Sequence, residues 1–468
     1  MKYLAILKDS LREAIDAKVF YVTVAISVLV SLAVLTVTYR PIPMIEMVEQ
    51  FTDLMNFVTR SRSPEAPKMG LPGVKETTIS DFKRLDEGTD AWTGNYEFTM
   101  DLELWDEAVE PKAPQPKGGE DPKDQQPKPQ AKAAKITANS MTLPLTMFYQ
   151  WFDSTTVTAL PSADPKHLRF DVKTNGIKRG YRTRQEWFHQ PAPLFGLVTL
   201  PIKFFKLEQI VRFIGNDVIG SFGAAVTMLL SCIITAFFLP NMMAKGTIDL
   251  LVVKPINRVT LFIYKFLGGM TFMLINTSVV MLGVWFGLGV QSGFWVPGFL
   301  LCIPIFTFEF MVFYSVSALS GVLTRSAIVS ILSVCMLWAL LTLIGYAYWF
   351  GVEQYKVQDL PTGVVEIEGD TKIRQPPEGW GITVIEVFHA LLPRYKDLDW
   401  LTAKAIKLEL IKPDDLSRPE LADNYRFQQQ VIQRQYGTYT WGPALGASTL
   451  FICIMVGLAA WRFTARDY

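Results

Sequence analysis

One acidic side chain lies deep inside an otherwise uncharged apolar run. Glu309 stands in the sequence Phe306-Thr307-Phe308-Glu309-Phe310, within the apolar residues 294–323. A carboxylate at this depth could take part in ion or proton movement, because burying a charge in hydrocarbon is costly without a purpose or a partner. It could equally hold helices together by a hydrogen bond to a Ser, Thr or Tyr of a neighbouring helix. The sequence therefore marks Glu309 as a functional or a packing site and leaves both roles open.

A second candidate is the basic segment 241–269, which reads NMMAKGTIDLLVVKPINRVTLFIYKFLGG. This segment predicts a short helix over residues 247–253 that breaks at Pro255, because proline supplies no helical amide. The side chain of Asn257 can cap the helix that follows. A compact, kinked element between two spans can transmit force, but a few basic residues in any cytoplasmic turn can also serve topology alone.

Motifs for bond-breaking chemistry are absent from the sequence. It contains no G-x-x-x-x-G-K-[ST] phosphate loop, no G-x-G-x-x-G after a predicted strand and no H-E-x-x-H. The three histidines, His167, His189 and His389, are widely spaced, whereas a catalytic metal site needs clustered ligands. We therefore expect no catalytic residue, no metal site and no cofactor bound by this chain.

The elements that would position these residues are membrane spans. Half of the 468 residues are apolar and 19% are charged, a balance typical of a protein that lies partly in lipid. A bilayer core of about 30 Å requires roughly 20 apolar helical residues. Six runs meet this requirement, at residues 19–38, 218–239, 266–288, 294–323, 326–350 and 441–461. We therefore predict a polytopic α-helical membrane protein with six transmembrane helices, in which the third and fourth separate at a turn within Gly287–Gly293.

Charge and cysteine positions exclude two further classes. The net charge of +1 provides no concentrated basic surface, so we expect no nucleic-acid partner. All four cysteines lie inside apolar runs, so we expect neither a disulfide framework nor a thiolate metal site.

The basic residues predict how the chain is oriented. Short segments rich in Lys and Arg lie at residues 1–18, 240–258 and 462–468 and at Arg325, all on one side of the six-span arrangement. By the positive-inside rule this side is the cytoplasm, so both termini are expected there. Apolar residues at helical spacing in residues 1–18 further predict an amphipathic helix along the inner membrane interface.

Two long polar segments, residues 39–216 and 351–440, are then expected on the outer side. The first is predicted to form a large mixed α/β domain, because residues 94–105 and 167–188 alternate like strands, with Asn175-Gly176 as a hairpin turn. Its Pro- and Lys-rich residues 109–135 are expected to be disordered or extended. The second segment is predicted to be a smaller helical insertion. Helical patterns lie in it at residues 382–392 and 397–411. In the first segment, residues 206–216 predict an amphipathic helix that leads into the second span.

The run KGTIDLLVVKPINR, followed by Tyr264-Lys265-Phe266-Leu267-Gly268-Gly269, resembles the signature after the second helix of type 2 ABC transporter permeases. The six-span pattern, the interfacial N-terminal helix and the basic tail WRFTARDY are also similar to that family. HALLPRYKDLD (389–399) resembles an external segment of some members, while the first external segment is far larger than in the family's compact exporters.

The resemblance implies that residues 240–258 form a cytoplasmic coupling loop, whose short helix sits in a groove of a separate ABC ATPase. ATP and Mg would be bound by that partner, and a second permease chain, in a homodimer or heterodimer, would complete the pathway. The location implied is a bacterial-type cytoplasmic (inner) membrane. The residues expected to couple to the ATPase are Lys245, Gly246, Thr247, Asp249, Leu250, Leu251, Lys254, Pro255 and Arg258.

Three functions follow from these patterns. The leading hypothesis is the permease subunit of an ATP-driven ABC transporter, an exporter that moves a substrate across or out of the membrane. The second is an ATPase-coupled mechanotransmitter that acts on envelope lipids or a periplasmic partner through its large external domain. The third is a channel or secondary transporter, which predicts broken helices and charged midplane residues, and Glu309 alone is available for that role.

Overall fold

The fold is described from a computed structural model of the chain. The structure describes residues 18–60, 74–105, 151–214, 257–358, 379–410 and 429–465, except for 88, 89, 91, 163, 165, 179, 180, 201–204, 430 and 433. The predicted N-terminal helix (1–18) lies outside these residues except for Lys18. The Pro-rich insertion (109–135), the second span (218–239) and all but the last two residues of the coupling loop (240–258) also lie outside them.

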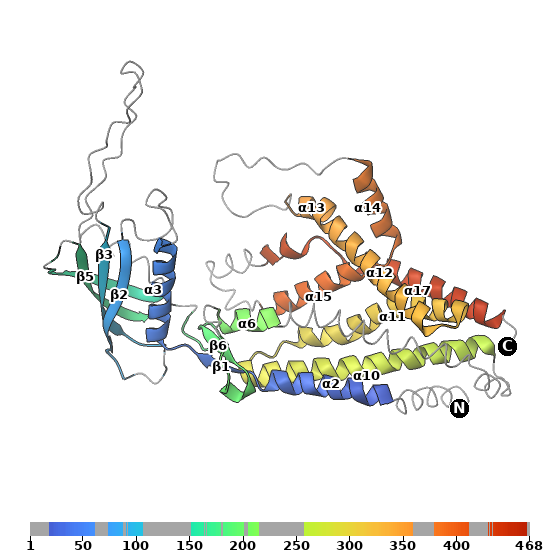
Figure 1. Ribbon diagram of the computed structural model, residues 1–468, viewed down its shortest axis with the longest axis horizontal. Helices are drawn as coiled ribbons and strands as arrows, with labels where there is room; N and C mark the ends of the chain where they lie inside the picture. Colours follow the sequence, from blue (N-terminus) through green and yellow to red (C-terminus); the bar gives the residue numbers. More distant parts are fainter. Residues whose placement is uncertain are drawn as a thin grey trace, which may run out of the picture. The chain divides into compact units, whose positions relative to one another are not determined.

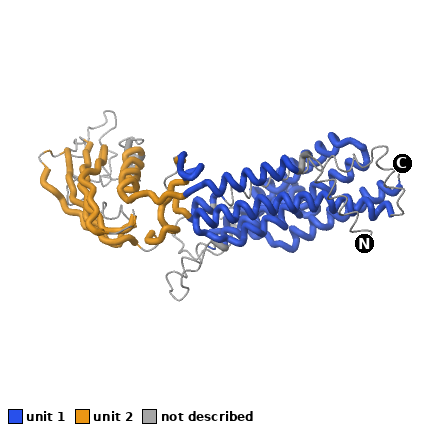
Figure 2. The backbone as a smooth tube through the Cα atoms, turned by 90° about the horizontal axis from the view of Figure 1, so that it is seen from below, with its two compact units in different colours: residues 1–38, 192–198, 208–468 blue, residues 39–191, 199–207 orange. Residues whose placement is uncertain are grey.

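Two compact units make up the chain (Figure 2). Unit 1 consists of Met1–Thr38, Ala192–Val198 and Glu208–Tyr468, and unit 2 consists of Tyr39–Pro191 and Thr199–Leu207. Each unit has its own hydrophobic core.

Long apolar helices dominate unit 1 (Figure 1). They are α2 (Lys18–Leu35), α10 (Arg258–Ser292), α11 (Cys302–Thr324), α12 (Ala327–Tyr348) and α17 (Trp441–Thr464). Within the described part of the chain, four helices are long and apolar enough to cross a membrane, and α2 adds a shorter apolar helix. These lengths are typical of a polytopic helical membrane protein.

The third and fourth predicted spans separate at Gly293, the last residue of the predicted turn. Helix α10 continues to Ser292 and ends at Gly293, whose φ of 77° is left-handed. Gly287 and Gly289 lie inside the helix, where a Cβ would come within 3.1 Å of the Leu35 backbone and 2.5 Å of the Trp295 ring. The first two glycines therefore permit close packing, and only the last makes the turn.

Capping side chains explain where two of the helices begin. The side chain of Asn257 accepts a hydrogen bond from the Val259 amide at 3.0 Å, so the predicted cap of α10 is confirmed. The Ser326 hydroxyl caps α12 by accepting a hydrogen bond from the Val329 amide, three residues on, at 3.5 Å. In contrast, α2 ends at Leu35, before the predicted end of the first span, because Thr38 begins a β-strand.

Between α12 and α17 the described chain is helical. The π-helical turn η4 (Trp349–Glu353) and α13 (Gln354–Gln358) extend α12. Two helices follow at the predicted positions, α14 (Trp380–Leu391) and α15 (Tyr395–Leu410). They are joined by a short turn that contains Pro393.

A four-stranded antiparallel sheet forms the centre of unit 2, in the order β2-β3-β5-β4. Its strands are β2 (Val74–Arg84), β3 (Tyr96–Leu104), β4 (Phe152–Leu160) and β5 (His167–Ile177). Helix α3 (Met44–Arg60) packs against the sheet, and Phe98, Leu102 and Phe170 are fully buried in the shared core. Unit 2 is therefore a mixed α/β domain.

Shorter elements complete the described chain. Strand β1 (Thr38–Pro41) pairs with β6 (His189–Ala192) in a separate two-stranded sheet. The 3-10 turn η1 (Leu194–Gly196) follows β6, η3 (Pro297–Leu301) precedes α11, and α6 (Leu207–Phe213) lies within the helix predicted over residues 206–216.

The predicted hairpin turn at Asn175-Gly176 was wrong. Both residues lie within β5, where Asn175 pairs with Ser154 of β4. Gly176 has a left-handed φ of 65°, and its amide donates a hydrogen bond to the Asn95 side chain at 2.8 Å. The glycine therefore permits a local distortion inside a continuing strand, which ends at Ile177 instead of extending to 188.

Candidate functional site

The predicted coupling residues fall almost entirely outside the described residues. Arg258 is the exception, and it is the first residue of α10. Its position directly after the capping Asn257 joins the predicted coupling segment to a membrane-spanning helix. The roles of Lys245 to Pro255 stay a prediction.

Glu309 lies in the interior of unit 1, on α11. Its side chain is only 3% exposed, so it faces protein and not acyl chains, as its charge led us to expect. Among the described residues its Oε1 atom has no hydrogen-bond partner. Asp399 and Lys396 of α15 interact with its carboxyl, and Tyr395 of the same helix interacts with it electrostatically.

These two partners form a buried ion pair. The Lys396 ammonium contacts the Asp399 carboxylate at 2.8 Å, and both side chains are less than one-sixth exposed. Burial raises the pKa of Asp399, and the Lys396 ammonium opposes this rise. With Glu309 the cluster holds two carboxyls and one ammonium, so the lysine is the only cation that faces both acidic side chains in this group of three.

The turn between α14 and α15 brings Lys396 to this position. Lys396 passes α12 at Gly345, where a Cβ would lie 2.8 Å from the lysine Cβ. The preceding Tyr395 contacts Phe313 of α11 edge-on, with ring centroids 5.4 Å apart. The Arg394 amide donates a hydrogen bond to Ser448 of α17 at 3.1 Å. The turn is therefore bound to three membrane-spanning helices at once.

A second polar contact joins helix α14 to helix α15 on either side of the turn at Pro393. His389 of α14 bonds Asp397 of α15 at 3.0 Å in a buried environment. The Tyr348 ring of α12 stacks on His389, with centroids 3.7 Å apart. Burial raises the pKa of Asp397, while the bond to His389 lowers it. This network holds the α14–α15 turn rigid against the end of α12.

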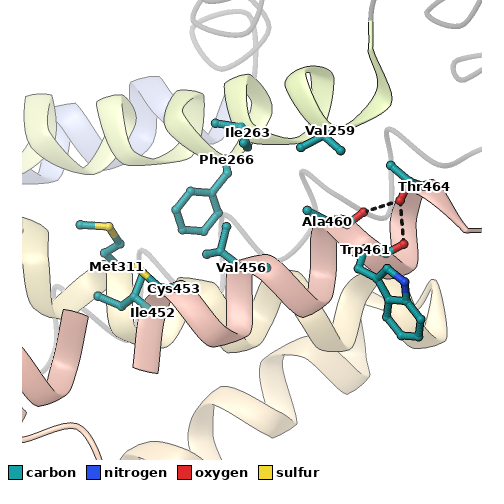
Figure 3. Close-up of a pocket in the computed structure, with 11 residues that line it drawn as sticks. Val259, Ile263, Phe266, Met311, Ile452, Cys453, Val456, Ala460, Trp461 and Thr464 are labelled. Atoms are coloured by element: carbon teal, nitrogen blue, oxygen red, sulfur yellow. Dashed lines mark hydrogen bonds between the residues drawn. The ribbon is translucent and has the colours of Figure 1, made fainter. Parts of the chain in front are cut away.

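Unit 1 also contains an apolar groove between α10, α11 and α17 (Figure 3). Its volume is about 670 Å³. The side chains of Ile263 and Phe266 on α10 face Val456 on α17 across it. The hydroxyl of Thr464 bonds the Trp461 carbonyl of its own helix at 2.8 Å, so it offers little to a polar ligand. The groove suits an acyl chain or an apolar helix.

Within the described ranges, the side chains do not gather into a metal site. No group of three or more His, Cys, Asp and Glu side chains is close enough there to hold a metal ion. The buried ionisable groups described above connect helices to one another, so their geometry suits the transmission of movement.

Sequence reasoning found Glu309 but missed Lys396 and Asp399. The two residues lie in HALLPRYKDLD, which stood out only for its resemblance to an external segment. Their spacing of three positions on a helix was the available signal, because a pair at this spacing shares one helix face. Nothing in the sequence linked that face to Glu309.

The chain was compared with known proteins. A family model described as ABC-2 family transporter protein matches residues 4–468. No curated protein and no solved structure is a match for the chain. Since the family model covers nearly the whole sequence, including every apolar helix described above, this chain belongs to the ABC-2 family of transporter proteins and is an ABC transporter permease of the membrane.

Proposed function

We propose that this chain is the membrane-spanning subunit of an ATP-driven exporter, working with a separate ABC ATPase that binds ATP and Mg. The observation that carries the proposal is the family match over residues 4–468, because members of this family normally work with an ABC ATPase subunit. Residues 240–258 would seat in the ATPase and pass its closure to α10 through Asn257 and Arg258. A second permease chain would complete the pathway.

The proposed topology has six spans with both termini in the cytoplasm of a bacterial-type inner membrane. Helix α2 runs parallel to α10, since Ser27 meets Asn276 and Leu35 meets Gln291. The Phe262 and Phe463 rings lie 5.8 Å apart, so the beginning of α10 adjoins the end of α17. This arrangement supports one basic side that carries Lys18, Arg258, Arg325 and Arg462.

Permeases of this kind would move their substrate by a rigid-body change in helix packing. The turn at Pro393 would then follow α11, α12 and α17, because its contacts with these helices are buried. Glu309 of α11 interacts with Lys396 and Asp399, which lie just after this turn. We propose that it helps to couple movement of the spans to the α14–α15 segment.

A second candidate function is mechanical action on envelope lipids or a periplasmic partner. The observation that favours it is unit 2, which has its own hydrophobic core of sheet and helix residues. A domain of this size would be unnecessary for a minimal solute pathway, and it would offer a surface on which ATP-driven movement could act.

Purification of the tagged full-length chain from native membranes would test the proposal. We expect an ABC ATPase to copurify and to hydrolyse ATP in lipid nanodiscs. Solute flux in vesicles would then separate export from mechanical action, since only an exporter accumulates its substrate across the bilayer. Recovery of the chain without any ATPase would contradict both functions.

A further inference from the structure

An apolar turn follows strand β6 at the Leu35 end of α2. It comprises Ala192–Val198 and belongs to the same compact unit as α2. The surrounding sequence, PAPLFGLVTLPI from residue 191 to 202, contains no charged residue. Such a run is expected to leave water unless a structural reason keeps it exposed.

Four large side chains of this turn nevertheless point away from the protein. The exposed fractions are 54% for Leu194, 67% for Phe195, 86% for Leu197 and 46% for Val198. Scattered exposed apolar residues are ordinary on a protein surface, but a contiguous set marks a site of interaction. The turn is therefore built to meet an apolar partner.

The backbone keeps these side chains exposed at a conformational cost. Leu194 and Phe195 have φ angles of 54° and 55°, in the left-handed region that residues with a Cβ rarely adopt. Hydrogen bonds hold this conformation. The Phe195 amide donates to the Thr36 carbonyl at 2.8 Å, and the Thr38 hydroxyl donates to the Ala192 carbonyl at 3.0 Å. The turn is thus attached directly to the end of a membrane helix.

The position of the turn along the membrane normal follows from the end of the neighbouring helix α10. The Gln291 side chain, one residue before the end of α10, donates to the Leu35 carbonyl at 2.6 Å, so α2 and α10 end at the same level. Trp295 lies just past the Gly293 cap of α10, is 45% exposed, and packs edge-on against Trp285, with ring centroids 4.9 Å apart. Tryptophan is enriched at the boundary between lipid and water. This end of the two helices therefore lies at a membrane interface.

We propose that Leu194, Phe195, Leu197 and Val198 form a lipid-embedded wedge, which inserts into the acyl-chain region of the leaflet at the Leu35 end of α2. The partner is phospholipid. Lipid is favoured over a protein partner because the turn is hydrogen-bonded at Thr36 to the end of α2, whose own apolar side chains are exposed, Leu29 by 64% and Leu32 by 50%. The wedge would anchor the Leu35 end of α2 in the leaflet.

Spin-label accessibility in lipid nanodiscs tests this proposal. In a full-length chain without native cysteines, a label at Leu197 should collide with oxygen as readily as one at Leu29. Its collisions with a water-soluble nickel chelate should be several-fold fewer than those of a label at Thr158, an exposed residue of β4. Nickel accessibility equal to that at Thr158 would overturn the proposal, and so would low accessibility to both reagents, which would indicate a protein partner.

A second measurement keeps the native cysteines. Benzoylphenylalanine at Leu197 disturbs no packing, since this residue is 86% exposed. After irradiation in phosphatidylethanolamine and phosphatidylglycerol nanodiscs, we expect phospholipid adducts by mass spectrometry, as at the control position Leu29. Adducts to a second copy of the chain, or none beyond the level at Thr158, would contradict the wedge. Neither measurement depends on the ATPase, so the wedge can fail while the proposed function stands.

Discussion

The hydroxyl of Ser27 on α2 donates a hydrogen bond to the amide oxygen of Asn276 on α10, at 2.6 Å in a buried environment. One turn further along, Ser31 faces Gly283, where an added Cβ would lie 2.1 Å from the serine hydroxyl. Gly283 and Gly287 are four positions apart, the spacing at which small residues let membrane helices approach closely. The α2–α10 pair therefore depends on small side chains and on hydrogen bonds from Ser27, Ser31 and Gln291 across the helix contact.

Gly283→Leu should separate α2 from α10, because the new side chain has no space against Ser31. We expect a loss of about 1–3 kcal/mol, typical of an overpacked site. Gly457→Leu is a matched control, since a Cβ at Gly457 on α17 meets no atom within 4 Å. Thermal unfolding in detergent would measure both variants. Equal unfolding temperatures for Gly283→Leu and the wild type would show that the close approach is unimportant.

Lys396→Met should destabilise unit 1 more than Glu309→Gln. Removing the ammonium leaves Glu309 and Asp399 buried without a cation in the cluster, a change that typically costs about 3–5 kcal/mol. Glu309→Gln removes a carboxyl but keeps its shape, and we expect a cost of about 1 kcal/mol or less. Membrane accumulation and protease resistance of the α14–α15 segment would measure the difference.

The ATP turnover of Glu309→Gln separates its two roles. If Glu309 couples movement, turnover should fall while the protein accumulates normally. Full activity, together with failure of Glu309→Leu to accumulate, would assign the residue to packing alone. If the Lys396→Met variant were as stable as the wild type, the ion pair between Lys396 and Asp399 would not contribute to the stability of unit 1.

Acid should weaken unit 2 through His189. Burial lowers the pKa of this fully buried histidine to about 4, whereas an unfolded histidine has a pKa of about 6.5. Between these values the unfolded chain binds a proton that the folded chain does not, so stability is lost as the pH falls from about 6.5 toward 4. The whole effect is at most about 3.4 kcal/mol, since each pKa unit corresponds to about 1.36 kcal/mol.

Hydrogen exchange of strands β3 and β5 in the full-length chain would measure this dependence. Protection, corrected for intrinsic rates, should decrease on acidification in the wild type and less so in His189→Gln. His167→Gln is the control, because His167 has a side chain that is 42% exposed. The same pH profile in both variants would exclude His189 as the responsible group.

Topology can be tested with single cysteines at described, exposed positions. Thr158→Cys in unit 2 and Val431→Cys before α17 should react with an impermeant reagent in intact cells. Thr324→Cys, at the basic turn beside Arg325, should react only after permeabilisation. Reaction of Thr324→Cys in intact cells, or protection of only one of the other two, would contradict the six-span arrangement.

Local patterns predicted the apolar helices, because their length and composition alone distinguish them from soluble helices. The Asn257 cap and helices α14 and α15 were also predictable from short-range signals. The Glu309–Lys396 contact was not, since it joins residues far apart in the chain. Two glycines, Gly287 and Gly176, do not make the turns expected of them. The sequence shows where a Cβ is missing, but it does not show the structural reason. At Gly287 the reason is helix packing, and at Gly176 it is a distortion within a strand.

If residues 240–258 couple this permease to an ABC ATPase, as proposed, Asp249→Lys should break that coupling most directly. The decisive measurement is copurification of the ATPase and ATP turnover in lipid nanodiscs, for the wild type, Asp249→Lys and the control Glu87→Lys, which makes the same charge change on an exposed loop of unit 2. We predict that Asp249→Lys inserts normally but loses at least about tenfold in ATPase binding, equivalent to about 1.4 kcal/mol, and loses stimulated turnover, while Glu87→Lys behaves as the wild type. An unchanged complex with unchanged turnover in Asp249→Lys would contradict the coupling assignment.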